Sequence, residues 1–112
     1  MSRALSLRSI EHVVLERGAA GSAWRTERWD SLRLLTPNWM TRLPGRGYDG
    51  SDPDGYMCAA GVARFLADYA GEIAAPLVGG TTVRRVVPGA GGGYRVETDR
   101  GAWTCRALVV AT

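Results

Sequence analysis

One stretch near the start of the chain has residue types that could bind a nucleotide. Val13, Val14 and Leu15 are consecutive apolar residues, as in a parallel strand covered on both faces. The acidic residue Glu16 follows at the end of this run. In a dinucleotide-binding fold, a carboxylate at the end of the second strand accepts hydrogen bonds from the ribose hydroxyls of the nucleotide. We therefore predict that residues 10–18 contain this strand and that Glu16 is the ribose ligand.

The residues before Glu16 lack a feature that normally accompanies such a strand. A glycine-rich phosphate loop lies about 20 residues before the acidic residue in this fold. Only fifteen residues precede Glu16, and none of them is glycine. Residues 1–8 are instead typical of the end of the helix that follows the phosphate loop. We therefore expect the chain to begin inside a nucleotide-binding fold.

Composition argues against several other classes of protein. The formal net charge is +3, but the fourteen basic residues, all of them arginine, are scattered among eleven acidic ones. This pattern gives no continuous basic surface for nucleic acid. No apolar run approaches the roughly eighteen residues that a membrane span needs. We therefore expect no nucleic-acid partner and no membrane association.

The few residues that could bind metal or act as nucleophiles are isolated in the sequence. Cys58 and Cys105 have neither the spacing of a zinc site nor the density of a disulfide scaffold. His12 is the single histidine, and no second ligand or nucleophile accompanies it. We predict no metal site, no catalytic residue in this chain, a reducing cytoplasmic location and a structural role for His12.

Hydrophobic periodicity predicts an α/β protein. Apolar residues such as Val62 and Phe65 recur at helical spacing within residues 59–75. Residues 80–106 alternate with a strand-like period between glycine-containing turns, which predicts three antiparallel strands. Residues 108–111 are wholly apolar, as in a buried parallel strand. The expected segments are a helix end and second Rossmann strand (1–18), an aromatic cofactor or substrate loop (19–58), a helix (59–75), a β-meander (80–106) and a returning strand (107–112).

The glycine cluster at residues 89–93 is predicted to be a hairpin turn. It lies between two expected antiparallel strands, and no helix begins after it. No helix N-terminus is therefore available there to bind a phosphate group.

The expected loop at residues 19–58 is long and rich in aromatic residues. It contains three tryptophans and shows no helical or strand-like period. Loops of this length in compact domains are usually functional or disordered, and the aromatic content argues against disorder. Two interpretations stay open, because the rings could contact a cofactor or could only cover the core. Asp30 and Arg33 are expected to form a polar pair that braces this loop.

Three motifs carry a resemblance to a known family. They are Val-Leu-Glu-Arg-Gly at residues 14–18, Gly-Ser-Ala-Trp-Arg at 21–25 and Arg-Trp-Asp-Ser-Leu-Arg-Leu-Leu-Thr-Pro at 28–37. With the helix, the meander and the final Val-Val-Ala-Thr in the same order, the chain resembles the flavin-containing monooxygenase group of FAD- and NADPH-dependent oxidoreductases. The resemblance covers essentially the whole chain. It implies that residues 1–112 form an incomplete Rossmann-like FAD-binding domain with a three-stranded antiparallel β-meander.

The resemblance implies roles for three residues at the adenosine end of FAD. Glu16 would hold the ribose, and Arg17 would lie near the adenine. Val83, in the first meander strand, would contact the adenine through its backbone. An acidic residue at the end of a strand is also common on protein surfaces, so Glu16 taken alone has a structural alternative.

Other residues would lie along the rest of the cofactor. The resemblance places Trp24 and Arg25 on the flavin side. It places Ala111 and Thr112 before a glycine that packs near the pyrophosphate. Arg25 could instead neutralise a local acid such as Asp30.

The resemblance also implies a reaction for the parent family. NADPH would reduce FAD by hydride transfer, and the reduced flavin would activate oxygen for transfer to a small nucleophilic or carbonyl substrate. The flavin supplies this chemistry, so the protein needs no nucleophile of its own. The NADPH site would lie outside this chain. Our leading hypothesis is a fragment of such an enzyme that is inactive alone, and the alternative is a non-catalytic binding or interaction module.

A strand order follows from the same resemblance. In the usual order of this fold, the first strand lies between the strand at residues 13–15 and the strand at residues 108–111. That first strand would precede the residues of this chain. We therefore expect the two segments either to remain apart or to pair with each other.

Overall fold

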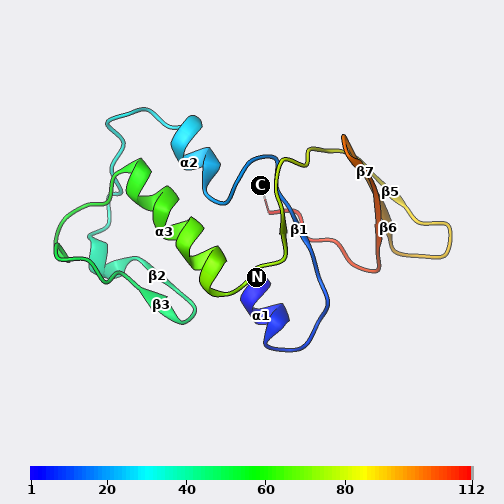
Figure 1. Cartoon of the computed structure of the whole chain (residues 1–112), viewed down its shortest axis with the longest axis horizontal. Helices are drawn as coiled ribbons and strands as arrows, with labels where there is room; N and C mark the ends of the chain where they lie inside the picture. Colours follow the sequence, from blue (N-terminus) through cyan, green and yellow to red (C-terminus); the bar gives the residue numbers. More distant parts are fainter. Residues whose placement is uncertain (112) are drawn as a thin grey trace.

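The computed structural model describes residues 1–111. The helices are α1 (Ser2–Ser6), α2 (Ser22–Thr26), the 3-10 helix η1 (Asn38–Met40) and α3 (Ala59–Glu72). The strands are β1 (Val14–Leu15), β2 (Arg42–Leu43), β3 (Arg46–Gly47), β4 (Leu77–Val78), β5 (Val83–Pro88), β6 (Tyr94–Thr98) and β7 (Gly101–Cys105). A helical part with α2, α3 and the β2–β3 hairpin lies at one end of the molecule, β1 lies in the middle and the β5–β6–β7 sheet lies at the other end (Figure 1).

Helix α3 forms because its apolar residues recur on one face, and this face makes the core. Its buried residues Val62 and Phe65 form a cluster with Met57, which lies two residues before the helix. Five partly buried side chains pack against this cluster: Trp24, Leu34, Leu43, Tyr48 and Leu66. The core therefore joins α2, the long loop and the hairpin to one helix.

Helix α3 ends at Glu72, earlier than the sequence pattern indicates. The N–H groups of Ala74 and Ala75 donate to the carbonyl oxygens of Gly71 and Ala70, at 3.0 Å each. These two bonds form a Schellman motif, in which the chain turns sharply after the helix. Ala74 takes the left-handed conformation at φ 47°. The turn directs the chain into β4.

Strands β1 and β4 run parallel in the middle of the molecule. Val14 lies opposite Leu77, and the N–H of Glu16 donates to the carbonyl oxygen of Val78 at 3.1 Å. Beyond the strands, the N–H of Thr81 donates to the carbonyl oxygen of Glu16 at 2.9 Å. Parallel strands need a long crossover between them, and here the crossover contains the loop and α3. The chain therefore forms a β-α-β unit.

The β2–β3 hairpin is attached to α3 by polar contacts. The hydroxyl of Tyr69 on α3 donates to the carbonyl oxygen of Pro44 in the hairpin turn at 2.9 Å. Arg46 forms an ion pair with Glu72, and its guanidinium carbon lies 5.1 Å from the centroid of the Phe65 ring. The hairpin thus covers one side of the core.

Strands β5, β6 and β7 form an antiparallel sheet in that order, which confirms the predicted three-stranded meander. Val86, Val96 and Trp103 lie opposite one another across the strands and therefore share one face. Val96 on the central strand is 2% exposed, whereas the other two side chains are exposed. The N–H of Gly89 donates to the carbonyl oxygen of Gly93 at 3.0 Å. This bond closes the hairpin turn predicted at residues 89–93.

The returning strand expected at residues 107–112 does not form over residues 107–111, and residue 112 lies outside the described residues. Val109 and Val110 are 59% and 74% exposed. An apolar run becomes a strand only where a neighbouring backbone pairs with it, and no described strand pairs with this one. The structure describes no pairing between residues 107–111 and β1, which pairs with β4, so of the two expected outcomes the segments remain unpaired with each other.

The region expected as a loop, residues 19–58, contains α2, η1 and the β2–β3 hairpin. Each element has five residues or fewer, which is too short to show a hydrophobic period. Among its aromatic residues, Trp24 and Tyr48 pack around the core, whereas Trp29 and Trp39 are exposed. Covering the core therefore accounts for some of the rings and not for the others.

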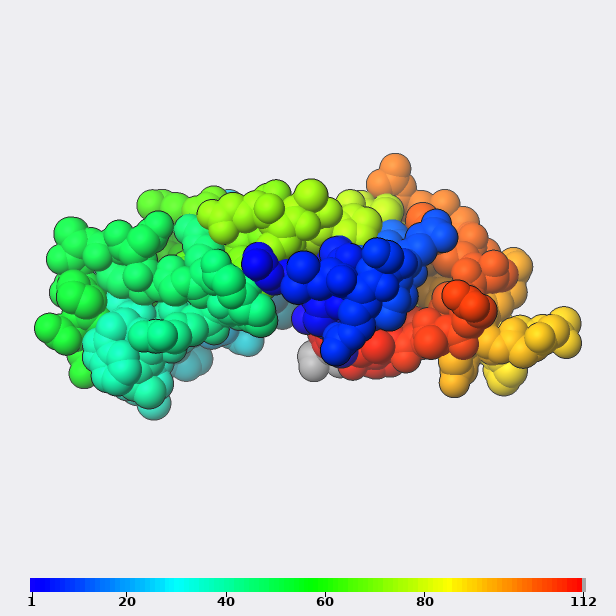
Figure 2. Space-filling view, turned by 90° about the horizontal axis from the view of Figure 1, so that it is seen from below, coloured from blue at the N-terminus to red at the C-terminus, as the bar shows by residue number. Residues whose placement is uncertain are grey.

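The molecule is elongated, with its N-terminal residues between the helical part and the meander (Figure 2). It measures 52 × 32 × 19 Å, and its radius of gyration is 16.4 Å, compared with about 13 Å for a compact domain of this length. Its accessible surface is 8102 Å², compared with about 6,000 Å² expected for its mass. We therefore expect the free energy of unfolding of these residues alone to be low.

Phe65→Ala should lower the free energy of unfolding by about 3–5 kcal/mol, because truncation of a buried ring removes contacts and leaves a cavity. Urea denaturation followed by circular dichroism should show a greatly lowered midpoint, or no folded baseline. Leu35→Ala is the control, because this side chain is 96% exposed, and it should leave the midpoint unchanged. Equal effects of the two substitutions would contradict the position of the core.

Gly21→Ala should separate α2 from α3. Gly21 has φ 74°, and a Cβ atom there would lie 2.6 Å from the carbonyl oxygen of Ala63. The substitution should lower the free energy of unfolding by more than about 1 kcal/mol, measured by thermal or urea unfolding. Gly71→Ala is the matched control, because a Cβ there meets nothing within 4 Å and alanine favours the helix. An unchanged stability of Gly21→Ala would show that the helices are not packed this closely.

Candidate functional site

The carboxylate of Glu16 lies directly after β1, at the carboxyl end of the parallel pair. Its Oε1 accepts a hydrogen bond from the N–H of Gly18 at 2.9 Å. No hydrogen bond from residues 1–111 reaches Oε2. Ligands of open α/β sheets bind outside the carboxyl ends of the strands. The oriented carboxylate, with one oxygen left for a ligand, is therefore the best candidate binding group at this edge.

Two close contacts bring other predicted site segments near Glu16. A Cβ atom on Gly18 would lie 2.3 Å from Oγ of Ser22, the first residue of α2. The hydrogen bond from Thr81 to Glu16 holds the segment that enters β5 two residues later at Val83. The end of β1, the start of α2 and the start of β5 therefore converge. Of the predicted site residues, Glu16 and Val83 are thus joined through the backbone.

Val83 has an open backbone environment. It is the first residue of β5, and its side chain is 43% exposed. β5 is an edge strand whose only neighbour in the described sheet is β6, so part of its backbone faces away from the sheet. A backbone contact from Val83 to an adenine stays a prediction that this open edge would permit.

Arg17 makes a contact that the sequence did not reveal. Its guanidinium pairs with the carboxylate of Glu27, which directly follows α2. Both side chains are exposed, at 69% and 45%, so the pair contributes little to stability. Arg17 can therefore leave Glu27 at small cost, and its predicted position near an adenine stays a prediction.

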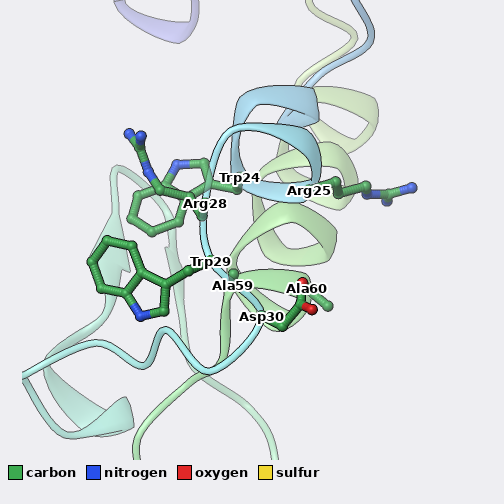
Figure 3. A pocket seen from close by; sticks show the side chains of 7 residues that line it. All are labelled: Trp24, Arg25, Arg28, Trp29, Asp30, Ala59 and Ala60. Atoms are coloured by element: carbon green, nitrogen blue, oxygen red, sulfur yellow. The ribbon is translucent and has the colours of Figure 1, made fainter.

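A cavity of about 190 Å³ lies where α2 meets the N-terminus of α3. It is lined by Trp24, Arg25, Arg28, Trp29, Asp30, Ala59 and Ala60 (Figure 3). The guanidinium carbon of Arg28 lies 5.2 Å from the centroid of the Trp24 ring, a cation–π contact. Trp24 also packs against the core. Its ring is therefore held in place from two sides.

Arg25 also lines this cavity but points away from Trp24 and Arg28 (Figure 3). It makes no ion pair with Asp30 or with another acid in residues 1–111. The bracing pair expected between Asp30 and Arg33 is also not formed. Arg33 instead donates from Nη1 to the carbonyl oxygen of Tyr56 at 3.0 Å. A β-bridge between Arg33 and Cys58 brings the backbone around Tyr56 close to Arg33.

The last two predicted site residues are not brought to Glu16 by any contact that the structure describes. Ala111 is exposed and follows the unpaired segment at residues 107–110. Thr112 lies outside the described residues. Their predicted place near a pyrophosphate stays a prediction.

One glycine pattern matches a phosphate-binding spacing by chance. Gly45, Gly47 and Gly50 have the Gly-x-Gly-x-x-Gly spacing, which binds phosphate only between a strand and the N-terminus of a helix. Here the pattern spans the turn of the β2–β3 hairpin and the bend after it, and no helix follows directly. The pattern therefore carries no phosphate site.

Both ring nitrogens of His12 form hydrogen bonds within the protein. Nδ1 lies 2.9 Å from the carbonyl oxygen of Ile10, which can only accept, so Nδ1 carries the proton. Nε2 accepts from the hydroxyl of Ser2 at 2.8 Å. The imidazole thus connects α1 to the segment before β1, in agreement with a structural role.

Other site types find no support in residues 1–111. No group of three or more histidine, cysteine or acidic side chains there is placed to hold a metal ion. Cys58 and Cys105 are free thiols. No helix in the described part has the length and apolar character needed to cross a bilayer.

Comparison with known proteins finds several relatives of this chain. No protein-family profile matches the sequence. An uncharacterized CzcO-like oxidoreductase of Geobacillus kaustophilus (strain HTA426) is 35% identical over 100 residues, which are 89% of this chain and 28% of that protein. A flavin-containing monooxygenase from Stenotrophomonas maltophilia matches 95% of this chain with 32% identity and a TM-score of 0.78. The chain is related to flavin-containing monooxygenase-like oxidoreductases.

The structural match is reproduced by a second structure of the same kind. A doubly substituted variant of the Stenotrophomonas maltophilia flavin monooxygenase also has a TM-score of 0.78, at 31% identity. In both cases the chain corresponds to 32% of the solved protein. The chain therefore spans about a third of the length of these relatives, and its fold is the fold of the matching third.

Glu16→Ala should leave the N–H of Gly18 without an acceptor and lower the free energy of unfolding by about 1–2 kcal/mol. Glu16→Gln keeps an oxygen at the same place and should cost less. Hydrogen exchange of the Gly18 amide, followed by NMR, should be faster in the alanine variant than in the glutamine variant. Identical exchange in the two variants would show that the carboxylate is not oriented by this bond.

Proposed function

We propose that this chain forms part of the FAD-binding site of an NADPH-dependent flavoprotein monooxygenase or oxidoreductase. The observation that carries the proposal is the carboxylate of Glu16 at the carboxyl end of a parallel strand pair, oriented by Gly18. The relationship to flavin monooxygenases supports the same assignment. When bound, FAD would accept a hydride from NADPH and activate oxygen for a small-molecule substrate.

The site fits the adenosine part of FAD. A ribose offers two neighbouring hydroxyl donors, and a carboxylate offers two acceptor oxygens. Oε1 of Glu16 is shared with Gly18, and Oε2 is left for the ligand. Val83 would present its backbone to the adenine, and Arg17 would move from Glu27 to the adenine side. The backbone bond between Thr81 and Glu16 keeps the ribose and adenine contacts at a fixed separation.

Trp24 and Arg25 would lie along the flavin side of the cofactor. They belong to α2, which begins beside Gly18, so a ligand that binds Glu16 can extend toward them. Ala111 and Thr112 would contribute near the pyrophosphate. No side chain of this set needs to act as a nucleophile. Their contribution would be binding and orientation of the cofactor.

We further propose that these 112 residues do not catalyse NADPH-dependent oxygenation on their own. The cavity at Trp24 has about 190 Å³, whereas ligand pockets usually have about 300–1,000 Å³. A flavin ring placed there would stay largely in water. Activation of oxygen needs a site that excludes water, so bound FAD should not support NADPH-dependent oxygenation by this chain.

Titration with FAD and with FMN tests the proposal, because FMN lacks the adenosine part. Glu16→Ala should weaken FAD binding about tenfold or more, the effect of losing hydrogen bonds to a charged group. The same variant should leave FMN binding unchanged. Flavin fluorescence anisotropy gives both affinities.

Glu11→Ala is the control, because Glu11 is an exposed acid of the same segment without an ion pair in residues 1–111. It should change neither affinity. Equal weakening of FAD and FMN by Glu16→Ala, or a well-folded chain that binds no FAD, would overturn the ribose assignment and favour a non-catalytic interaction module. NADPH oxidation above the free-flavin background would overturn the proposed inactivity.

A further inference from the structure

A second cavity, of about 400 Å³, lies between α3 and the chain that leaves the β2–β3 hairpin. It shares no lining residue with the cavity at Trp24. Its size lies within the usual range for small-molecule sites, about 300–1,000 Å³. No residue assigned to the flavin lines it. We propose that this cavity binds a small organic carboxylate with an apolar or aromatic body.

The floor and walls of the cavity suit an apolar group. Met57 and Phe65 are buried core residues that line it. Tyr48 is half-buried against the same core, and Tyr56 is 49% exposed at the opening. Aromatic and thioether surfaces of this kind make favourable contacts with aromatic ligands. A ligand body can therefore bury apolar surface here without rearrangement of the core.

Two of the three arginines around the cavity have no acidic partner in residues 1–111. Among its three arginines, Arg46 is already paired with Glu72 and lies 3.9 Å from Asp68. Arg64 makes no ion pair or hydrogen bond within residues 1–111. Arg33 donates one N–H to a backbone carbonyl and has no acidic partner in that part of the chain.

The remaining acid on the cavity wall decides the charge of the ligand. Asp49 lines the cavity and makes no ion pair with residues 1–111. The lining side chains include three arginines and two aspartates, Asp49 and Asp68, so their net charge is +1, and Glu72 pairs with Arg46 from outside the lining. A dianion such as phosphate would bring a second negative charge close to Asp49. A monocarboxylate matches the excess, and the planar guanidinium group binds a carboxylate through two parallel hydrogen bonds.

Phenylacetate tests the proposal, with phenylacetamide as the probe of the same shape without charge. The 112-residue chain should bind phenylacetate saturably and phenylacetamide much more weakly. Amide chemical shifts in NMR titrations should move at Tyr48, Gly50 and Gly61, which surround the cavity. The shifts of Arg28 and Trp29, around the other cavity, should stay in place.

Arg64→Gln should weaken phenylacetate binding at least about tenfold, because it removes the charge and keeps most of the side-chain stem. Arg84→Gln on β5 is the matched control, since Arg84 is exposed, carries the same charge and lies outside the cavity. It should change the affinity less than about twofold, the scale of a distant surface charge. Both arginines are exposed, so neither substitution should affect folding, which circular dichroism will verify.

Three results would overturn the proposal. They are absence of saturable phenylacetate binding, equal affinity for phenylacetamide, and equal weakening by Arg64→Gln and Arg84→Gln. The experiment contains no flavin, and none of the substituted residues belongs to the proposed FAD site. Failure of the carboxylate site and failure of the FAD site are therefore separate results.

Discussion

The backbone ladder between residues 14–18 and residues 76–81 is the constraint on which the rest of the structure depends. It joins two segments that are far apart in the sequence, and it aligns them in parallel. Parallel alignment places the carboxyl ends of β1 and β4 at one edge, and Glu16 lies at that edge. The same ladder continues to Thr81 and so fixes where the meander begins. Without these hydrogen bonds, α3 and the meander would have no defined position relative to Glu16.

Stability is distributed unevenly around this ladder. The helical part has an apolar core at Met57, Val62 and Phe65, and polar contacts of Arg46 hold the hairpin against it. The middle of the molecule contains two strands of two residues each, and Val109 and Val110 beyond the meander are exposed. Exposed apolar surface of this kind is typical of regions that contact other protein surfaces. The candidate ribose ligand thus lies beside two strands of intermediate burial, outside the apolar core.

The two candidate binding regions differ in their physical basis. At Glu16 the ligand group is an acid, and its position is set by backbone hydrogen bonds at the end of a strand. At the α3 cavity, Arg33 and Arg64 have no acidic partner in residues 1–111, and the buried side chains of Met57 and Phe65 line the same cavity. A sugar with hydroxyl donors suits the first region. An apolar acid suits the second.

The sequence by itself determined the elements that have a long repeating pattern. The apolar residues of α3 and the alternation of the meander predicted elements that the structure contains, because each pattern reports which side of an element is buried. The run from Val13 to Leu15 predicted a parallel strand, which forms at Val14 and Leu15 but is only partly buried. The motifs around Trp24 predicted the relationship to flavin monooxygenases.

The tertiary structure decided the features that depend on contacts with residues distant in the sequence. The two residues of β4 became a strand because β1 lies beside them, whereas the strongly apolar residues 107–111 did not, because no described strand pairs with them. The partners of Arg17 and Arg33, and the grouping of Arg33 with Arg64 around one cavity, follow from the packing of the loop on α3. Such contacts join residues far apart in the chain, so no local pattern in the sequence specifies them.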